Sequence, residues 1–152
     1  MDFTNLFSVF RISGSGLAAQ RRLIEATSSN IANIETTDTD QGGPYIPQRV
    51  SFKSTKQSDS FGSLLDRANR FNPVERGLGS MVTAKTFDQQ VEPTKKEYEP
   101  ENPKADEQGY VEKPNINLTL EMGNMMVASR AYEANVTVLN AAKAMMKKAL
   151  EI

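Results

Sequence analysis

The placement of proline divides this chain of 152 residues into two flanks and a middle. All seven prolines lie between residues 44 and 114, and none lies in residues 1–43 or 115–152. An interior proline removes a helical hydrogen bond and clashes with the preceding turn, so the middle cannot be one long helix. Neither flank has that restriction. The sequence therefore predicts a long helix at each end, joined by a middle segment of a different kind.

The N-terminal flank, residues 1–34, is predicted to be one helix from about Phe3 to Ile34. Apolar residues recur in it at a spacing of seven, which places them on one seam along a helix face. Gly14 and Gly16 interrupt this helix, and each interior glycine costs about 1 kcal/mol relative to alanine. We expect the isolated helix to be marginal and to need a partner. The N-terminal seam comprises Phe3, Phe10, Leu17, Ile24 and Ile31.

The C-terminal flank, residues 115–152, is predicted to be a second helix with a heptad pattern. Asn115 or Asn117 is its expected N-cap, and at 1.5 Å per residue each helix would be roughly 45–50 Å long. The heptad positions are Leu118, Met122, Met125, Ser129, Tyr132, Val136, Leu139, Lys143, Met146 and Leu150. The C-terminal seam, at a strict spacing of seven, comprises Leu118, Met125, Tyr132, Leu139 and Met146.

The middle is predicted to be partly β and otherwise irregular. Alternating β-formers over 45–52 and 81–91 predict strands, and residues 63–71 suggest a short helix. Residues 35–97 are expected to form a small β-containing region, and residues 98–114 a Pro-rich extended linker. The predicted fold is therefore mainly α, with the terminal helices forming an antiparallel, coiled-coil-like pair.

The composition excludes several classes of catalytic site and metal-binding site. The chain has no histidine and no cysteine, so Ser-His-Asp sites, Cys-His sites, Cys/His zinc sites and disulfides are impossible. A net charge of −1 gives no long-range attraction to nucleic acid. The N-terminal flank has neither 18 consecutive apolar residues nor a cleavable signal pattern, so we expect no integral membrane protein and no Sec leader. We expect no enzyme, no cofactor, no metal and no small-molecule substrate.

Four sequence features have a second interpretation. Residues 14–19 match a loose dinucleotide-binding pattern, but the apolar seam runs through them and favours a helix packed closely at its glycines. Residues 38–43 resemble the start of a calcium loop, but Arg49 would occupy the position that needs a bidentate carboxylate. Five methionines in the C-terminal helix fit either ordinary core or an adaptable interface. Paired carboxylates near residues 99–107 indicate a solubilising loop.

Two helices cannot bury broad apolar faces against each other alone, so surface remains for other chains. This favours assembly over catalysis. The hypothesis is that the two seams carry contacts between subunits. The alternative is a helical adaptor or scaffold that folds alone and binds one partner helix.

The residues also carry a resemblance to a known family. Residues 28–33, followed by 35–37, resemble the N-terminal signature of bacterial flagellar axial proteins, which comprise rod, hook and hook-associated proteins. Residues 105–117 resemble the segment that precedes the last helix of proximal rod proteins in that family, and residues 122–148 resemble that helix. The signature residues are Asn30, Ala32, Asn33, Thr36, Gly42, Gly43, Pro44, Tyr45, Asp106, Gly109, Tyr110, Val111, Pro114 and Asn115.

The resemblance covers residues 1–52 and 98–150. The family commonly has His-Pro where this chain has Asn102-Pro103, so no role of that histidine is carried over. The resemblance implies a structural subunit of the basal-body rod, which crosses the periplasm and transmits torque. It implies partners among other copies, other rod proteins and the flagellar type III export apparatus, with export lacking a cleaved signal. It also implies terminal segments that become ordered on assembly.

Overall fold

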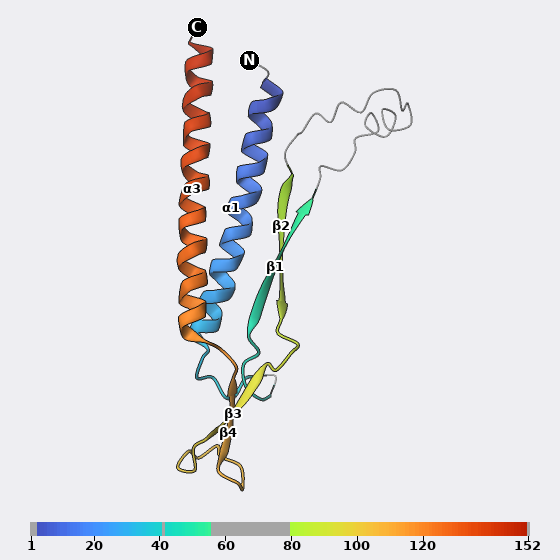
Figure 1. The fold of residues 1–152 in the computed structure, drawn as a ribbon, viewed down its shortest axis with the longest axis vertical. Helices are drawn as coiled ribbons and strands as arrows, with labels where there is room; N and C mark the ends of the chain where they lie inside the picture. The colour runs from blue at the N-terminus through green and yellow to red at the C-terminus, as the bar shows by residue number, and fades with distance from the viewer. Residues whose placement is uncertain (1–2, 41, 56–79, 152) are drawn as a thin grey trace, which may run out of the picture.

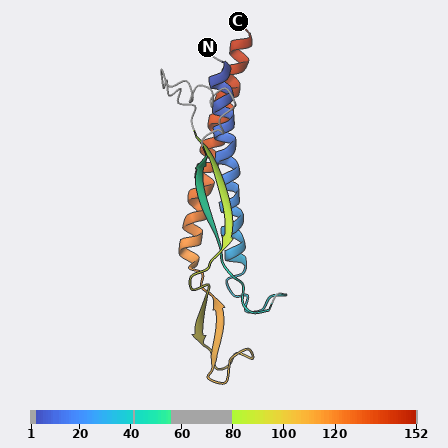
Figure 2. The same ribbon diagram turned by 90° about the vertical axis from the view of Figure 1, so that its right-hand side faces the viewer.

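Two long helices dominate the protein. A computed structural model describes residues 3–40, 42–55 and 80–151. In it, helix α1 spans Phe3–Ala32 and helix α3 spans Leu118–Leu150. They lie side by side and run antiparallel, so both chain ends lie at the same end of the molecule (Figures 1 and 2). The predicted flanking helices are confirmed, each within a few residues of its expected bounds.

The middle of the chain forms two separate antiparallel β-hairpins. Strands β1 (Gln48–Thr55) and β2 (Met81–Asp88) pair with each other, and β3 (Thr94–Tyr98) pairs with β4 (Tyr110–Pro114). The β1–β2 hairpin lies along α1, whereas the β3–β4 hairpin lies at the end of the molecule opposite the chain termini (Figure 1). The predicted small β-containing middle is confirmed, and the expected short helix at 63–71 lies outside the described residues.

The structure differs from the expected linker at residues 98–114. Tyr98 pairs with Tyr110 and Thr94 pairs with Pro114, so the chain turns back on itself instead of running on as an extended segment. The reason is local: Tyr110 and Val111 are residues that favour strands, and Gly109 supplies the positive φ that the turn before them needs. The four-part division of the chain stays a prediction.

The core is thin and consists largely of alanine. Ala19 and Ala26 on α1, and Ala128 and Ala142 on α3, are buried. Small side chains at these positions let the two helix backbones approach closely. The large apolar side chains of the helices are partly or fully exposed instead. Apolar burial per residue is therefore low, and it limits how much stability the helix pair can gain on its own.

Candidate assembly surface

Asn30, a signature residue, joins the end of α1 to the start of β1. Its side chain is buried, and its Nδ2 donates a hydrogen bond to the Gln48 carbonyl at 2.8 Å. Its Oδ1 accepts from the Gln48 N–H at 2.7 Å and from the Tyr45 hydroxyl at 3.1 Å. The side-chain amide thus pairs with Gln48 as a neighbouring strand would. Only asparagine or glutamine offers a donor and an acceptor in this arrangement.

The turn after α1 is held by further signature residues. Asn33 Nδ2 donates to the Ser29 carbonyl at 2.9 Å, and Asn33 Oδ1 accepts from the Thr36 hydroxyl at 3.2 Å. The Thr36 carbonyl in turn accepts from the Tyr45 N–H at 3.0 Å. Gly42 adopts a φ of 85°, a conformation that side-chain-bearing residues rarely take. These residues fix the direction in which the chain leaves the helix.

The second group of signature residues builds the tip of the β3–β4 hairpin. Asp106 Oδ1 accepts hydrogen bonds from the N–H groups of Gln108 and Tyr110, each at 2.9 Å. These hydrogen bonds hold the pKa of Asp106 below its ordinary value, and the bond from Tyr110 has the largest effect. A Cβ on Gly109 would lie 2.9 Å from a ring carbon of Tyr98, so only glycine fits there. Tyr98 packs edge-on against Tyr110, with ring centroids 5.3 Å apart.

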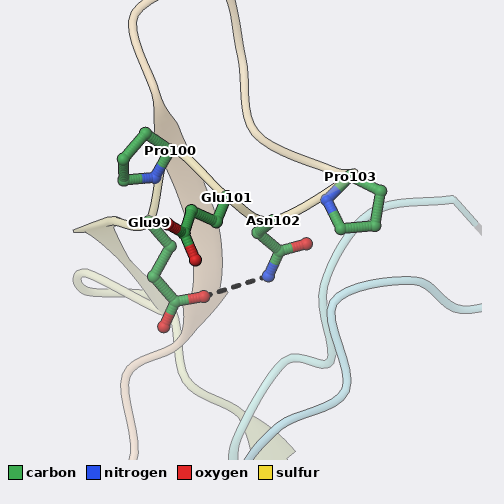
Figure 3. Close-up of a pocket in the computed structure, with 5 residues that line it drawn as sticks. All are labelled: Glu99, Pro100, Glu101, Asn102 and Pro103. Atoms are coloured by element: carbon green, nitrogen blue, oxygen red, sulfur yellow. Dashed lines mark hydrogen bonds between the residues drawn. The ribbon is translucent and has the colours of Figure 1, made fainter.

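Lys113 ties this hairpin to the end of α1. Its ammonium group binds the Glu99 carboxylate and lies 3.4 Å from Glu35 and 3.6 Å from Glu97. The pKa of Lys113 is raised, chiefly by the hydrogen bond with Glu99. The pKa of Glu99 is lowered, first by Lys113 and then by Asn102. Figure 3 shows the bond from Asn102 to Glu99 in the shallow pocket that residues 99–103 line.

The remaining signature residues pack where the hairpin meets α3. Val111 and Pro114 are fully buried, and Asn115 Nδ2 donates to the Glu92 carbonyl at 3.0 Å. Asn117 caps α3 by accepting from the Leu120 N–H, which confirms one of the two expected caps. The signature residues with contacts described here therefore fall into two groups, one at the junction of the helices with the β3–β4 hairpin and one at the tip of that hairpin.

Sequence reasoning missed one ion pair. Glu121 is almost fully buried in the first turn of α3, and its Oε1 lies 3.0 Å from Nη1 of Arg49 on β1. Arg49 Nε also donates to Gln89 at 2.9 Å. The only signal in the sequence was a lone carboxylate at the start of an apolar helical pattern. A helix N-terminus favours a negative charge, so the position suits Glu121.

The helix contact itself uses small residues. The buried positions of α3, which are Glu121, Ala128 and Ala142, recur at multiples of seven, and Asn135 belongs to the same line. Asn135 lies against Gly16, where an added Cβ would be 3.0 Å from its Nδ2. The close packing expected at the glycines is thus present at Gly16, and Gly14 has open space instead.

The two predicted seams lie beside this contact. Phe10, Leu17, Ile24 and Ile31 are half-buried, as are Met125, Leu139 and Met146. Leu118 and Tyr132 are exposed, and the side chain of Phe3 lies outside the described residues. The C-terminal seam is offset by three residues from the buried line of α3, which corresponds to about 60° around the helix. Its role in packing between subunits stays a prediction.

A separate line of large apolar side chains faces outward from α3. We call it the outer stripe, and its members share one face because they are spaced by seven or eleven residues. Their exposed fractions range from 46% to 68%. The outer stripe comprises Leu120, Val127, Val138 and Met145.

The β1–β2 hairpin does not cover the outer stripe. The hairpin packs along α1, where Ser15 Oγ accepts from the Val82 N–H at 3.1 Å and Arg22 donates to the Ala84 carbonyl at 3.3 Å. Helix α3 lies on the other side of α1 (Figure 1). Large apolar side chains exposed along one face of a long helix are typical of a surface that binds another protein.

The described residues offer little for catalysis. They contain no group of three or more acidic side chains placed to hold a metal, and no buried side-chain nitrogen or oxygen lacks a hydrogen-bond partner. Among these residues no helix is both long and apolar enough to cross a membrane.

Known proteins with similar sequences belong to one group of assembling proteins. The family described as "Flagellar basal body rod FlgEFG protein C-terminal" matches residues 107–152, and the family described as "Flagella basal body rod protein" matches residues 10–38. A "Flagellar basal-body rod protein FlgC" from Borreliella burgdorferi is 40% identical over 153 residues, covering 97% of each chain.

Two further relatives with that description give the same result. The protein from Bacillus subtilis is 38% identical, covering 96% of this chain and 97% of the relative, and the protein from Salmonella typhimurium is 37% identical, covering 97% of each. The resemblance inferred from the signature residues is confirmed. With such identity along nearly the whole of each relative, the chain belongs to the FlgC family of flagellar basal-body rod proteins.

Proposed function

We propose that this chain assembles into the flagellar rod by packing the outward faces of its two terminal helices against neighbouring subunits. Members of its family are structural rod subunits and not enzymes, so the chain is a structural protein of the bacterial flagellar basal body. The partners in this proposal are other copies of the chain and other rod proteins.

One observation carries the proposal. Helix α3 is 33 residues long and packs along α1 alone among the described elements, with Arg49 on β1 adding one ion pair. Its outer stripe is left exposed. Burying one side chain such as Val127 or Leu120 removes it from water at a gain of about 1.5–3 kcal/mol. Neighbouring helices in an assembly would supply that burial along the whole length of α3.

The two seams have a second role in this proposal. They flank the α1–α3 contact, and most of their described members are half-buried in the single chain, so a neighbouring helix could complete their burial in the assembly. The pair would then be one layer of a larger coiled-coil-like bundle. Because Leu17 and Leu139 also border the α1–α3 contact, substitutions there would disturb folding and assembly together. The outer stripe therefore offers a cleaner test.

The cellular setting in this proposal follows from the family relationship. The assembled chain would form part of the drive shaft that crosses the periplasm and transmits torque. It would reach that location through the flagellar type III export apparatus without losing a signal peptide. Fractionation and N-terminal sequencing of the assembled protein test these points, and a cleaved N-terminus would contradict them.

The test of the assembly face is Val127→Asp, compared with Thr137→Asp as a matched control. Both place a carboxylate at an exposed position of α3, but Thr137 lies about 80–100° around the helix from the outer stripe. We expect Val127→Asp to abolish swimming in a bacterial strain whose own gene for this protein is deleted. The free energy of unfolding of the purified chain should change by less than about 0.5 kcal/mol. Normal swimming with Val127→Asp would overturn the assignment of this face.

Hydrogen exchange on the monomer separates this function from the alternative of a self-folding adaptor. If α1 and α3 fold fully only in the assembly, residues 3–34 and 118–150 exchange fast in the free chain and slowly in the rod. Strong protection of both helices in a confirmed monomer would favour the adaptor. Such protection would contradict folding on assembly.

A further inference from the structure

Charge is distributed unevenly along the long axis of the molecule. At the end that holds the chain termini, the described residues 3–14 and 140–151 carry four basic side chains and one acidic side chain. At the opposite end, residues 92–114 carry seven acidic and four basic side chains. Glu35 and Asp38 lie 3.4 Å from Lys113 and 3.9 Å from Lys104 of that hairpin, and they add two further carboxylates to this end.

The basic end contains an apolar hollow. Its lining residues lie on the last three turns of α3 and comprise Asn140, Lys143, Ala144, Met146, Lys147 and Leu150. Leu150 is 76% exposed, and Lys143 and Lys147 are exposed beside it. An apolar surface bordered by two ammonium groups suits a partner that presents apolar or aromatic groups beside carboxylates.

The acidic end presents a surface of that kind. At the tip of the β3–β4 hairpin, Tyr98 is 63% exposed and Tyr110 is 40% exposed. Glu101 and Glu107 are exposed on the loop between them. The bonds of Asp106 and the ion pair of Lys113 with Glu99 hold this loop in place, so little order has to be gained on binding.

We propose that the β3–β4 tip of one copy docks against the C-terminal end of α3 in a second copy of this chain. The aromatic side chains of the tip would cover the hollow, and its carboxylates would face Lys143 and Lys147. The two surfaces lie at opposite ends of an elongated molecule, so the contact is head-to-tail and leaves a free surface at each end. Such a contact would extend an assembly lengthwise. This proposal rests on the proposed function, because it adds an axial contact to the lateral contacts between helices.

Site-specific cross-linking tests this contact. The chain has no cysteine, so two introduced cysteines report on one pair of positions. Copies carrying Leu150→Cys are mixed with copies carrying Glu101→Cys at high protein concentration and low salt, and are then oxidised. We expect a disulfide-linked dimer from the mixture, because a disulfide requires Cα atoms within about 7 Å. A mixture of Thr137→Cys with Glu101→Cys serves as the control and should give no such dimer.

Charge variants test the stated chemistry. Adding Lys143→Glu and Lys147→Glu to the Leu150→Cys copy should lower the dimer yield about tenfold, because both ammonium groups become carboxylates that face an acidic tip. Glu107→Lys on the other copy should restore part of that yield. Raising the salt concentration should lower the yield of the unaltered pair, because exposed charges are then screened. A dimer yield that changes neither with these charge substitutions nor with salt concentration would overturn the proposal.

The same cysteines distinguish this proposal from the proposed function. If Leu150→Cys and Glu101→Cys give no dimer in solution or in assembled rods, while Val127→Asp abolishes swimming, the axial contact is wrong and the lateral function stands. If Leu150→Cys in cells cross-links only to a different rod protein, the second copy is the wrong occupant. A disulfide-linked dimer of the Leu150→Cys and Glu101→Cys copies in assembled rods supports both the lateral function and the axial contact.

Discussion

The two ends of this molecule are stabilised in different ways. At the β3–β4 end, Asn30, Asp106 and Lys113 each make several polar contacts, and Val111 is fully buried. Along the helix pair, the buried side chains are mainly alanines, and the large apolar residues remain outside. We therefore expect the first region to hold its shape in the single chain, and the second to gain stability when neighbouring subunits cover it.

This difference matches the division of tasks in a rod subunit. A subunit that is complete at one end presents a fixed surface to the next one. A subunit that is incomplete along its helices has a free-energy reason to assemble. Substitutions that weaken one region at a time test this difference between the helix pair and the β3–β4 end.

The largest effect is expected at Asn30, and the variant is Asn30→Leu. The N–H and carbonyl groups of Gln48 would lose their partner inside the protein, and each buried unsatisfied group costs about 1–3 kcal/mol. We expect the free energy of unfolding to fall by about 3 kcal/mol in denaturant titrations. Asn33→Ala is the matched control at a half-buried position and should cost less. Equal losses from the two variants would contradict the role of the Asn30 amide.

The sequence predicted the helices more closely than it predicted their contact. Long spans without proline and a repeating apolar pattern fix the existence and approximate bounds of α1 and α3. The contact between helices depends on which side chains are small enough for close approach. The sequence predicts close packing at the glycines, which is found at Gly16, but the seams of large apolar residues do not include Ala128 and Ala142. The buried line of α3 was therefore offset from the predicted seam.

The junction was only partly predictable. The signature residues were identifiable by resemblance, and Asn117 by its position ahead of the helix. The hydrogen bonds of Asn30 to Gln48 and the pairing of Glu121 with Arg49 join segments 18 and 72 residues apart. Local patterns carry no information about such pairs. The β3–β4 hairpin was not predicted, because residues 92–114 are rich in proline and charged residues, which are uncommon in strands.

The second prediction concerns acid stability of the β3–β4 end. The pKa values of Glu99 and Asp106 are lowered in the folded chain, so their contribution to stability is present above about pH 4 and is lost as the pH falls further. We expect amides of residues 98–113 to lose exchange protection at a higher pH than those of residues 19–30. Glu99→Gln should remove part of this pH dependence. Simultaneous loss in both regions would contradict the comparison.

The smallest effect is expected from two glycines of α1, and it tests how tightly the helix pair is packed. Gly14→Ala adds a methyl group to open space and removes the cost of an interior glycine, so it should stabilise the chain by about 0.5–1 kcal/mol. Gly16→Ala brings the same gain but places its Cβ 3.0 Å from Asn135, which must shift. The net change at Gly16 should be close to zero. Thermal unfolding of both variants measures the difference, and an equal gain at Gly16 would mean that α1 and α3 are loosely packed in the free chain.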